Sequence, residues 1–234
     1  MAGKIHGAPG FCINTEMHRP PRDLMEKLAR FPVAIIGDSL GRRSTMDAAI
    51  KPINPERRFC GPALTIEVRS GDNLMAHAAL AMAKAGDVLV IDAHADLSTA
   101  IMGGLMAHSA AKIGVAAVVI DGALRDRDEL FGSSVAFFCR GISPCGPDKD
   151  GPGQINMPIS CGGVAVQPGD IIVGDSDGIV VVPQAMAGKA IEASAAKSAS
   201  ERKRMEEIDR GEINQAWLMP ALRAKGLLKD GESL

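Results

Sequence analysis

Aromatic residues are scarce in this chain of 234 residues, which contains one Trp, no Tyr and six Phe. Proteins that bind single-stranded nucleic acid stack the bases on aromatic side chains, and a basic surface is the usual electrostatic sign of nucleic-acid binding. Lys and Arg number 26 against 28 Asp and Glu, which gives a formal net charge of -2. We therefore expect no nucleic-acid partner.

Long apolar runs and paired cysteines are absent as well. The apolar runs fall short of the roughly 20 residues that a membrane-spanning helix needs, and the N-terminus lacks the charged and apolar parts of a signal peptide. The five cysteines are scattered and include no Cys-x-x-Cys pair. This pattern argues against zinc and is typical of reduced thiols. We expect a cytoplasmic protein without a membrane partner.

The apolar content, 46% of the residues, is sufficient for one sizeable core. We predict a single domain over residues 1–234, with an N-terminal arm and helix at 1–31, a core at 32–183 and a helical tail at 184–234. Helical periodicity and end signals predict helices at Pro21–Ala29, Leu74–Ala83, Leu105–Ile113 and Ala185–Arg210. Short apolar runs between turn signals predict strands at Ala63–Val68, Val88–Ile91, Val115–Ile120, Val135–Phe138, Val164–Val166, Ile171–Gly174 and Ile179–Val182.

Three stretches have no such pattern. Residues 1–21 indicate an arm or an irregular lead-in, and Gly141–Gly153, dense in Gly, Pro and Asp, indicates a loop that shapes a pocket. At 33–41, a short apolar run followed by Gly-Asp-Ser-Leu-Gly indicates a turn from strand to helix. Asp38 in this turn is either an acid near a site or a helix cap.

The segment from Gly103 to Glu129 carries the chemistry. Two glycines precede a predicted helix, whose free N–H groups favour an anion, although the spacing matches neither a P-loop nor a Rossmann fingerprint. A buried strand and then Asp121-Gly122 follow, and a charged run comes next with Arg125, Asp126, Asp128 and Glu129. Ligands of open α/β sheets lie at the carboxyl ends of strands. The segment therefore indicates a metal-dependent enzyme that acts on a small carboxylate.

Each part of this segment has a second interpretation that the residues alone leave open. Arg binds carboxylates in a bidentate way, and neighbouring carboxylates suit Mg²⁺ or Mn²⁺. In the second interpretation, the charged run is a surface turn whose charges pair with one another, and the glycine pair is a tight turn that binds no ligand. The histidines His77, His94 and His108 have no metal-site spacing, so we expect structural roles for them.

Five motifs occur in an order that resembles one known family. They are Gly-Asp-Ser-Leu-Gly-Arg at 37–42, Gly-Asp-Asn-Leu at 71–74, Gly-Asp-Val-Leu-Val-Ile-Asp at 86–92, Gly-Gly-Leu-Met at 103–106 and Val-Ile-Asp-Gly-Ala-Leu-Arg-Asp at 119–126. Over Pro32–Pro183 the chain resembles the RraA-like family. This family contains the regulator of ribonuclease E activity and the class II 4-hydroxy-4-methyl-2-oxoglutarate aldolases, also called 4-carboxy-4-hydroxy-2-oxoadipate aldolases.

The resemblance implies an α/β/β/α sandwich of the swivelling-domain type with a C-terminal helical tail, assembled as a trimer or a hexamer. The family's aldolases carry Asp, twenty residues and Arg-Asp, or else Gly, twenty residues, Arg-Asp, two residues and an acid. The chain fits the second version through Gly104, Arg125, Asp126 and Glu129. The regulators lack a complete carboxylate set, so Glu129 favours an enzyme.

The resemblance also implies roles for single residues. Asp126 and Glu129 would hold a divalent metal, Mg²⁺ or alternatively Mn²⁺ or Co²⁺, and Arg125 would bind the carboxylate or enolate oxygen of the pyruvyl part of a 2-oxo acid. The pyruvyl carboxylate would lie at Gly103 and Gly104, on the amides of Leu105 and Met106. Asp38 stands where the aldolases carry a Glu that orders a water, and Glu201 from the tail of a neighbouring subunit is the candidate third acid.

The activity implied is that of a lyase. It would cleave a 4-hydroxy-2-oxo di- or tricarboxylic acid to pyruvate and a second 2-oxo acid, and would also decarboxylate oxaloacetate. The alternative is a non-catalytic regulator of a ribonuclease that acts by protein–protein binding.

Overall fold

A computed structural model of the chain describes residues 4–213, 215–229, 231, 232 and 234. The chain divides into two compact units, Met1–Ala195 and Ala196–Leu234. The first unit contains the sheets, and the second contains the end of the long helix α6 (Ala187–Asp209) and the short helix α7 (Leu218–Ala224). Within the described residues, no helix is both long enough and apolar enough to cross a membrane.

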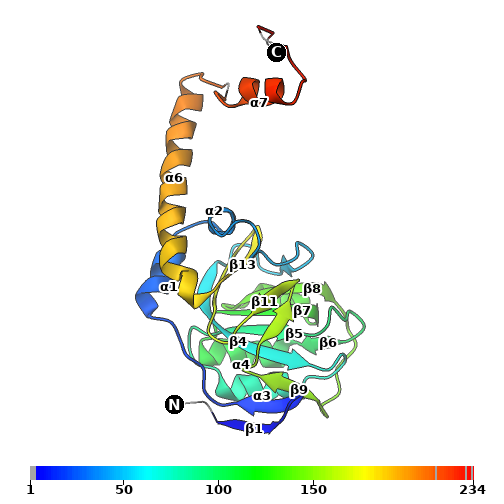
Figure 1. The fold of residues 1–234 in the computed structure, drawn as a ribbon. Helices are drawn as coiled ribbons and strands as arrows, with labels where there is room; N and C mark the ends of the chain where they lie inside the picture. Colours follow the sequence, from blue (N-terminus) through cyan, green and yellow to red (C-terminus); the bar gives the residue numbers. More distant parts are fainter. Residues whose placement is uncertain (1–3, 214, 230, 233) are drawn as a thin grey trace. The chain divides into compact units, whose positions relative to one another are not determined.

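Four parallel strands form the centre of the large sheet (Figure 1). Their order is β4 (Phe59–Val68), β5 (Val88–Asp92), β7 (Ala117–Leu124) and β8 (Ala136–Ile142). All residues of β7 are buried, as expected for a strand that is covered on both faces. The four predicted central strands are confirmed. Because β7 continues to Leu124, Asp121 lies within the strand, whereas the sequence pattern predicts it after the strand. The Asp121 carboxylate accepts hydrogen bonds from Arg140 and from the Gly162 N–H.

The expectation of an irregular lead-in is wrong for residues 5–14, whereas residues 15–21 form no helix or strand. β1 (Ile5–Ala8) and β2 (Phe11–Asn14) form an antiparallel hairpin, joined by Pro9 and by Gly10 at φ 87°. A proline followed by a residue with positive φ is the signature of a type II turn. β2 pairs in parallel with β9 (Gly153–Ile155), which in turn pairs antiparallel to β4. The arm therefore extends the sheet at the edge next to the loop that ends at Gly153.

Two helices cover one face of the sheet, and a second layer of strands covers the other. The helices are α3 (Leu74–Met82) and α4 (Gly104–Ile113), and the strands are β10 (Ile159–Cys161), β11 (Val164–Val166), β12 (Ile171–Asp175) and β13 (Gly178–Val182). The far side of β12 and β13 packs against α1 (Arg22–Leu28), α2 (Val33–Ser39) and the first turn of α6. These α/β/β/α layers confirm the predicted sandwich. Two further short strands, β3 (Lys51–Pro52) and β6 (Ala100–Met102), pair with β8 and β7.

Residues 33–39 form the helix α2, and not the end of a strand followed by a turn as expected. Pro32 precedes the helix with φ -58° and ψ 145°, and the buried carboxylate of Asp175 accepts the N–H of Val33 at 2.9 Å. Val33, Ile36 and Gly37 are buried at helical spacing. Asp38 is consequently near the C-terminal end of a helix, so its predicted role as an N-terminal cap is wrong.

One buried ion pair ties the N-terminal arm to the sheet. Asp87, directly before β5, is fully buried and accepts hydrogen bonds from Arg19 at 2.8 and 2.7 Å and from the Lys84 N–H at 2.8 Å. We expect Arg19→Met to lower the free energy of unfolding by about 3 kcal/mol, because it leaves a buried carboxylate without its partner. Urea denaturation measures this change.

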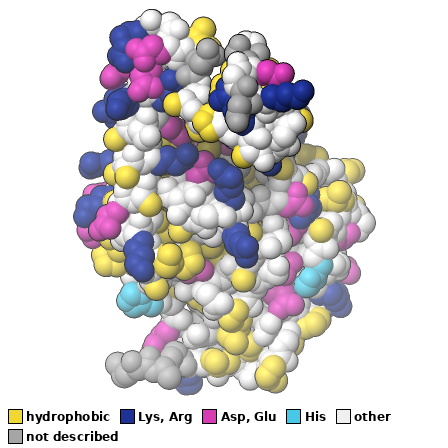
Figure 2. All heavy atoms as spheres, turned by 45° about the horizontal axis from the view of Figure 1, so that its top comes forward, with side chains coloured by type: hydrophobic (Ala, Val, Ile, Leu, Met, Phe, Trp, Pro, Cys, Tyr) yellow, Lys and Arg dark blue, Asp and Glu magenta, His cyan; other side chains and the backbone are white. Residues whose placement is uncertain are grey.

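Arg22→Met is the matched control. Arg22 pairs with Glu26 at 2.8 Å, but its side chain is 88% exposed, and exposed pairs contribute less than about 1 kcal/mol. Basic and acidic side chains are interspersed over the face that Figure 2 shows, as on a surface where single exposed ion pairs add little stability. Equal losses in the two variants would contradict the structural role of Arg19.

Candidate active site

The two glycines at the start of α4 leave space for charged side chains. Gly103 is extended, with φ -147° and ψ -164°, so its backbone requires no glycine. A Cβ at Gly103 would collide with the Asp126 carboxylate and lie 2.8 Å from Arg125 Cγ. A Cβ at Gly104 would collide with the carboxylate of Glu129. The glycine pair is therefore more than a tight turn, because it lets Arg125, Asp126 and Glu129 approach the helix start.

Asp126 joins the end of β7 to α4. Its backbone is left-handed at φ 58° and begins α5 (Arg127–Phe131), and its Oδ2 accepts the Gly104 N–H at 2.8 Å. A carboxylate at a helix N-terminus is favoured by the helix dipole. Arg125 Nε lies 3.6 Å from the same oxygen, and Gly146 allows the guanidinium to lie against its Cα, since a Cβ there would be 2.9 Å from Arg125 Nη1. The charged run is thus hydrogen-bonded to the start of α4 through Asp126, and its charges do not pair only with one another.

The carboxylates of Asp126 and Glu129 both lie against Gly104. Whether they fit the predicted divalent metal ion follows from their number and chemistry. The part of the chain that the structure describes contains no group of three or more His, Cys, Asp and Glu that could hold a metal ion. Zinc sites need three or four protein ligands, whereas Mg²⁺ is commonly held by one or two carboxylates and keeps several waters. Two carboxylates in a space that a Cβ would fill therefore fit a hydrated Mg²⁺-type ion.

A pocket of about 160 Å³ lies beside this cluster. Its lining residues come from α3, β6, the start of α4, the end of β7 and the loop before β9, and they are Asn73, His77, Ala100, Ile101, Met102, Gly103, Leu105, Met106, Arg125, Asp126, Pro147 and Lys149. Arg125 and Lys149 give the pocket two cations. Burial and the charge of Lys149 both lower the pKa of His77. Because the carboxylate in the lining, Asp126, is the one predicted to hold the metal, the two cations leave the pocket suited to a small dianion.

The structure brings most of the predicted residues together. Gly103, Leu105, Met106, Arg125 and Asp126 line the pocket. Gly104 and Glu129 line a neighbouring pocket of about 440 Å³ together with His108 and Asp128.

Two predicted acids are not brought to this pocket. Asp38 lies on α2, accepts a hydrogen bond from Arg42 Nε at 2.7 Å and is not part of the pocket lining. Glu201 belongs to the second unit, where it pairs with Lys197 at 3.1 Å. The roles implied for Asp38 and Glu201 stay predictions.

Three lining residues were missed or placed in another role. His77, for which we expected a structural role, lies in the pocket wall, as do Asn73 and Lys149. The signal for Asn73 and His77 was the Gly-Asp-Asn turn before α3, which faces the helix start at Gly103. Lys149 lies in the irregular loop, where no periodic pattern predicts which side chains reach the pocket. His94 is elsewhere, between Glu67 at 3.7 Å and Asp92 at 3.6 Å.

Comparison with known proteins agrees with this fold. Residues 23–181 match the family model described as RraA-like: Aldolase/RraA. A Halalkalibacterium halodurans protein named "Putative 4-hydroxy-4-methyl-2-oxoglutarate aldolase" is 39% identical over 182 residues, or 78% of this chain and 87% of that protein. The solved structure of the RNA-processing inhibitor RraA from Thermus thermophilis is 30% identical, with a TM-score of 0.61, and covers 65% of this chain and 92% of that one. Streptomyces coelicolor RraAS2, an unusual member of the RNase ES inhibitor RraA protein family, is 28% identical with a TM-score of 0.69, over 83% of this chain and all (100%) of that one.

The chain is an α/β/β/α sandwich with an acidic helix start beside a cationic pocket, and it belongs to the RraA-like family. The resemblance stated from its motifs is confirmed.

Proposed function

We propose that this protein is a divalent-metal-dependent aldolase. It cleaves a 4-hydroxy-2-oxo di- or tricarboxylic acid to pyruvate and a second 2-oxo acid, and it decarboxylates oxaloacetate. The observation that carries the proposal is the glycine pair, which brings Arg125, Asp126 and Glu129 to the N-terminus of α4 beside the dianion pocket. The aldolase name of the Halalkalibacterium halodurans relative supports the same activity.

Asp126 and Glu129 would hold the metal, with waters completing its coordination. Bound there, a Mg²⁺-type ion would supply positive charge for the negative charge that develops on the substrate oxygens. As the family resemblance implies, the protein would form a trimer or hexamer, in which Glu201 of a neighbouring subunit adds a further acid.

Arg125 and the start of α4 bind the pyruvyl part of the substrate. The first amides of a helix have no partner within it, and Asp126 already accepts that of Gly104. The amides of Leu105 and Met106 are then the donors for the pyruvyl carboxylate, and the Arg125 guanidinium binds the 2-oxo oxygen. Lys149, the other cation of the pocket lining, takes the second carboxylate of the substrate.

The reaction follows from where charge develops. In aldol cleavage the C4 hydroxyl loses its proton, the C3–C4 bond breaks, and its electron pair passes to C3 and the 2-oxo group as a pyruvate enolate. Decarboxylation of oxaloacetate breaks the C3–C4 bond with loss of CO₂ and gives the same enolate. In both reactions C3 of the enolate then takes a proton from solvent water, which gives pyruvate. Arg125 stabilises the enolate oxygen as a preorganised donor. His77, kept neutral by its lowered pKa, is the group in the pocket wall that accepts the hydroxyl proton.

Pyruvate release tests the proposal. Oxaloacetate and 4-hydroxy-4-methyl-2-oxoglutarate are supplied with Mg²⁺, and again with excess chelator, while lactate dehydrogenase and NADH report pyruvate. We expect turnover of both substrates that the chelator abolishes. Asp126→Ala should lower the rate at least about 100-fold by removing a charge at the reacting centre. Asp128→Ala is the control on the same short helix and should retain activity; a fully active Asp126→Ala variant would refute the site.

The second candidate is regulation of a ribonuclease by protein binding. It is favoured by the likeness of the fold to the two RraA inhibitor structures. It predicts no pyruvate release from either substrate and a stable complex with ribonuclease E in size-exclusion chromatography. Metal-dependent turnover without such a complex would exclude this alternative.

A further inference from the structure

A buried aspartate before α3 accepts hydrogen bonds with both oxygens of its carboxylate. Asp72 is fully buried, and its Oδ1 accepts the N–H of Leu74 at 2.9 Å. Its Oδ2 accepts the N–H groups of Asp150 at 2.6 Å and Gly151 at 3.0 Å. Arg69 Nη2 lies 3.3 Å from the same oxygen. A buried carboxylate is costly unless it is paired and hydrogen-bonded. The hydrogen bonds of Asp72 offset this cost and join the start of α3 to residues 150–151.

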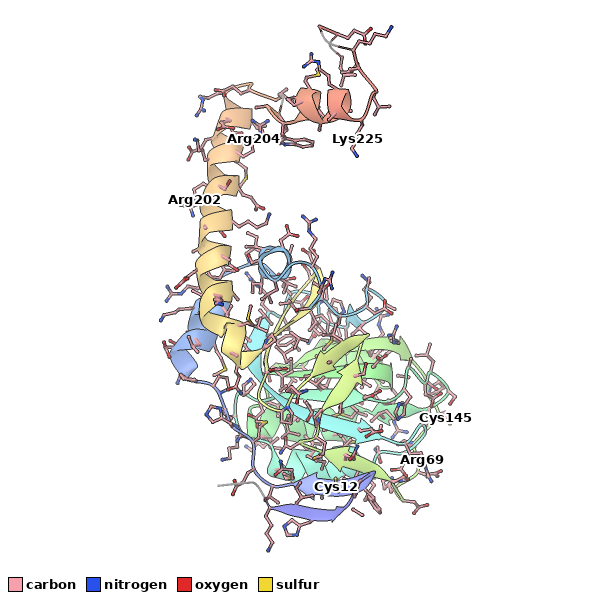
Figure 3. All side chains as sticks on the ribbon, viewed as in Figure 1. Cys12, Arg69, Cys145, Arg202, Arg204 and Lys225 are labelled. Carbon is pink, nitrogen blue, oxygen red and sulfur yellow. The ribbon has the colours of Figure 1, made fainter. Side chains whose placement is uncertain are left out.

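The segment joined to α3 is the part of the loop that carries Lys149. Besides the Asp72 contacts, the Asp148 carbonyl accepts the Asn73 N–H at 3.0 Å, and the Asp148 N–H is donated to the Gly71 carbonyl at 2.8 Å. The loop is therefore fastened at Asp148 and at Asp150, on either side of Lys149. Figure 3 labels Arg69, which lies close to this loop, and Cys145 at the loop's other end.

The same turn also reaches the opposite wall of the pocket. Asn73 Nδ2 donates to the Ile101 carbonyl at 2.9 Å, and Ile101 lies two residues before Gly103. The 71–73 turn thus holds both the strand that leads into the glycine pair and the loop that carries Lys149.

We propose that Asp72 is a positioning residue: it holds Lys149 in the pocket wall and thereby sets the preference for substrates with a second carboxylate. This inference rests on the proposed function for its consequence in catalysis, but the placement of Lys149 does not depend on turnover. Burial alone would raise the pKa of Asp72, yet the amides of Leu74, Asp150 and Gly151 and the charge of Arg69 lower it. Asp72 is therefore ionised at neutral pH and accepts from both segments.

The pKa of His77 reports where Lys149 is. The positive charge of Lys149 lowers that pKa, so the pKa should rise when Lys149 leaves the pocket. Asp72→Asn retains one acceptor oxygen and turns an NH₂ group toward an N–H donor, which releases the loop. The lost negative charge would by itself lower the pKa of His77. An upward shift therefore reports either less burial of His77 or loss of the Lys149 charge, and combining Asp72→Asn with Lys149→Met separates the two causes.

The experiment is an NMR titration of the histidine ring protons, with the His77 signal assigned by its loss in His77→Gln. We expect Asp72→Asn and Lys149→Met each to shift the His77 pKa upward, and Lys149→Met to add little in the Asp72→Asn background. Asp175→Asn is the matched control, since buried Asp175 also accepts two backbone N–H groups, from Val33 at 2.9 Å and Asp177 at 3.0 Å, away from the pocket. It should leave the pKa unchanged.

Kinetics complete the test. If Lys149 binds a carboxylate of oxaloacetate, Asp72→Asn and Lys149→Met should each raise KM about tenfold, as for the loss of one charged hydrogen bond, with a smaller change in kcat. Should Asp72→Asn not fold, Arg69→Met removes only the half-exposed partner of Asp72. This variant should shift the His77 pKa upward and raise KM for oxaloacetate, both by less than Asp72→Asn.

An unshifted His77 pKa in folded Asp72→Asn, or an equal shift in Asp175→Asn, would overturn the positioning role. A wild-type protein that releases no pyruvate but shows the expected titration would refute the proposed function and keep the placement of Lys149.

Discussion

Replacing Arg125 with Met is expected to lower kcat/KM for pyruvate release about 100- to 1000-fold, the usual effect of removing one donor to a developing oxyanion. Arg125 is the cation that lies next to Asp126, with Nε 3.6 Å from its carboxylate, and it lines the pocket. Its side chain is 42% exposed, so the substitution should change the free energy of unfolding little. The lactate dehydrogenase assay with oxaloacetate measures the loss.

Two further variants separate the charge of Arg125 from its shape. Arg125→Lys retains a positive charge but loses the planar pair of donors, so we expect at least about a tenfold loss of kcat/KM, an effect of one good hydrogen bond. Arg127→Met removes an exposed arginine from α5, two residues away, and should retain wild-type activity. If Arg127→Met were the more damaging change, the cation at the site would be misassigned.

The central strands were predictable because they are local features of the sequence. The apolar runs of β5 and β7 stand between turn signals, and a strand buried on both faces needs no partner to be recognised. The hairpin β1–β2 and the helix α2 were missed for a different reason. β2 is a strand because β9, about 140 residues later in the chain, pairs with it, and α2 begins where Asp175 accepts the N–H of Val33.

The candidate site divides in the same way. Arg125 and Asp126 follow a buried strand, and Gly103 and Gly104 precede a helix, so their meeting at one end of the sheet could be inferred from general rules. Lys149 could not be found in this way, since its loop is directed by Asp72, which is 77 positions earlier in the sequence. Long-range contacts of buried polar groups thus decide which loop residues reach a site, and local patterns do not contain them.

Gly104→Ala is expected to reduce activity without reducing stability. Gly104 is the first residue of α4, a position that Ala occupies without backbone strain, and the Glu129 side chain that must move is exposed, so the melting temperature should not fall. The added Cβ would collide with the Glu129 carboxylate and displace it from the metal site. We expect the Mg²⁺ concentration for half-maximal pyruvate release to rise about 10- to 100-fold, as when a supporting ligand is lost.

Moving the carboxylate from position 129 to position 104 gives a stronger test of the metal site. In the other version of the aldolase motif an Asp stands at the position of Gly104, and the Glu129 carboxylate occupies the space which that side chain would fill. Glu129→Ala alone should raise the Mg²⁺ concentration for half-maximal pyruvate release, as Gly104→Ala does. Glu129→Ala combined with Gly104→Asp frees the space and returns a carboxylate to it, so activity at low Mg²⁺ should recover by about tenfold or more relative to Glu129→Ala.

Such a recovery would show that the chain needs a carboxylate at this point in space and not at a particular position in the sequence. Gly104→Asp with Glu129 intact is the control, because two carboxylates would then crowd one site, and we expect it to be less active than the exchanged variant. An exchanged variant no better than Glu129→Ala would mean that Glu129 acts through something other than the metal, and its assignment as a metal ligand would fail.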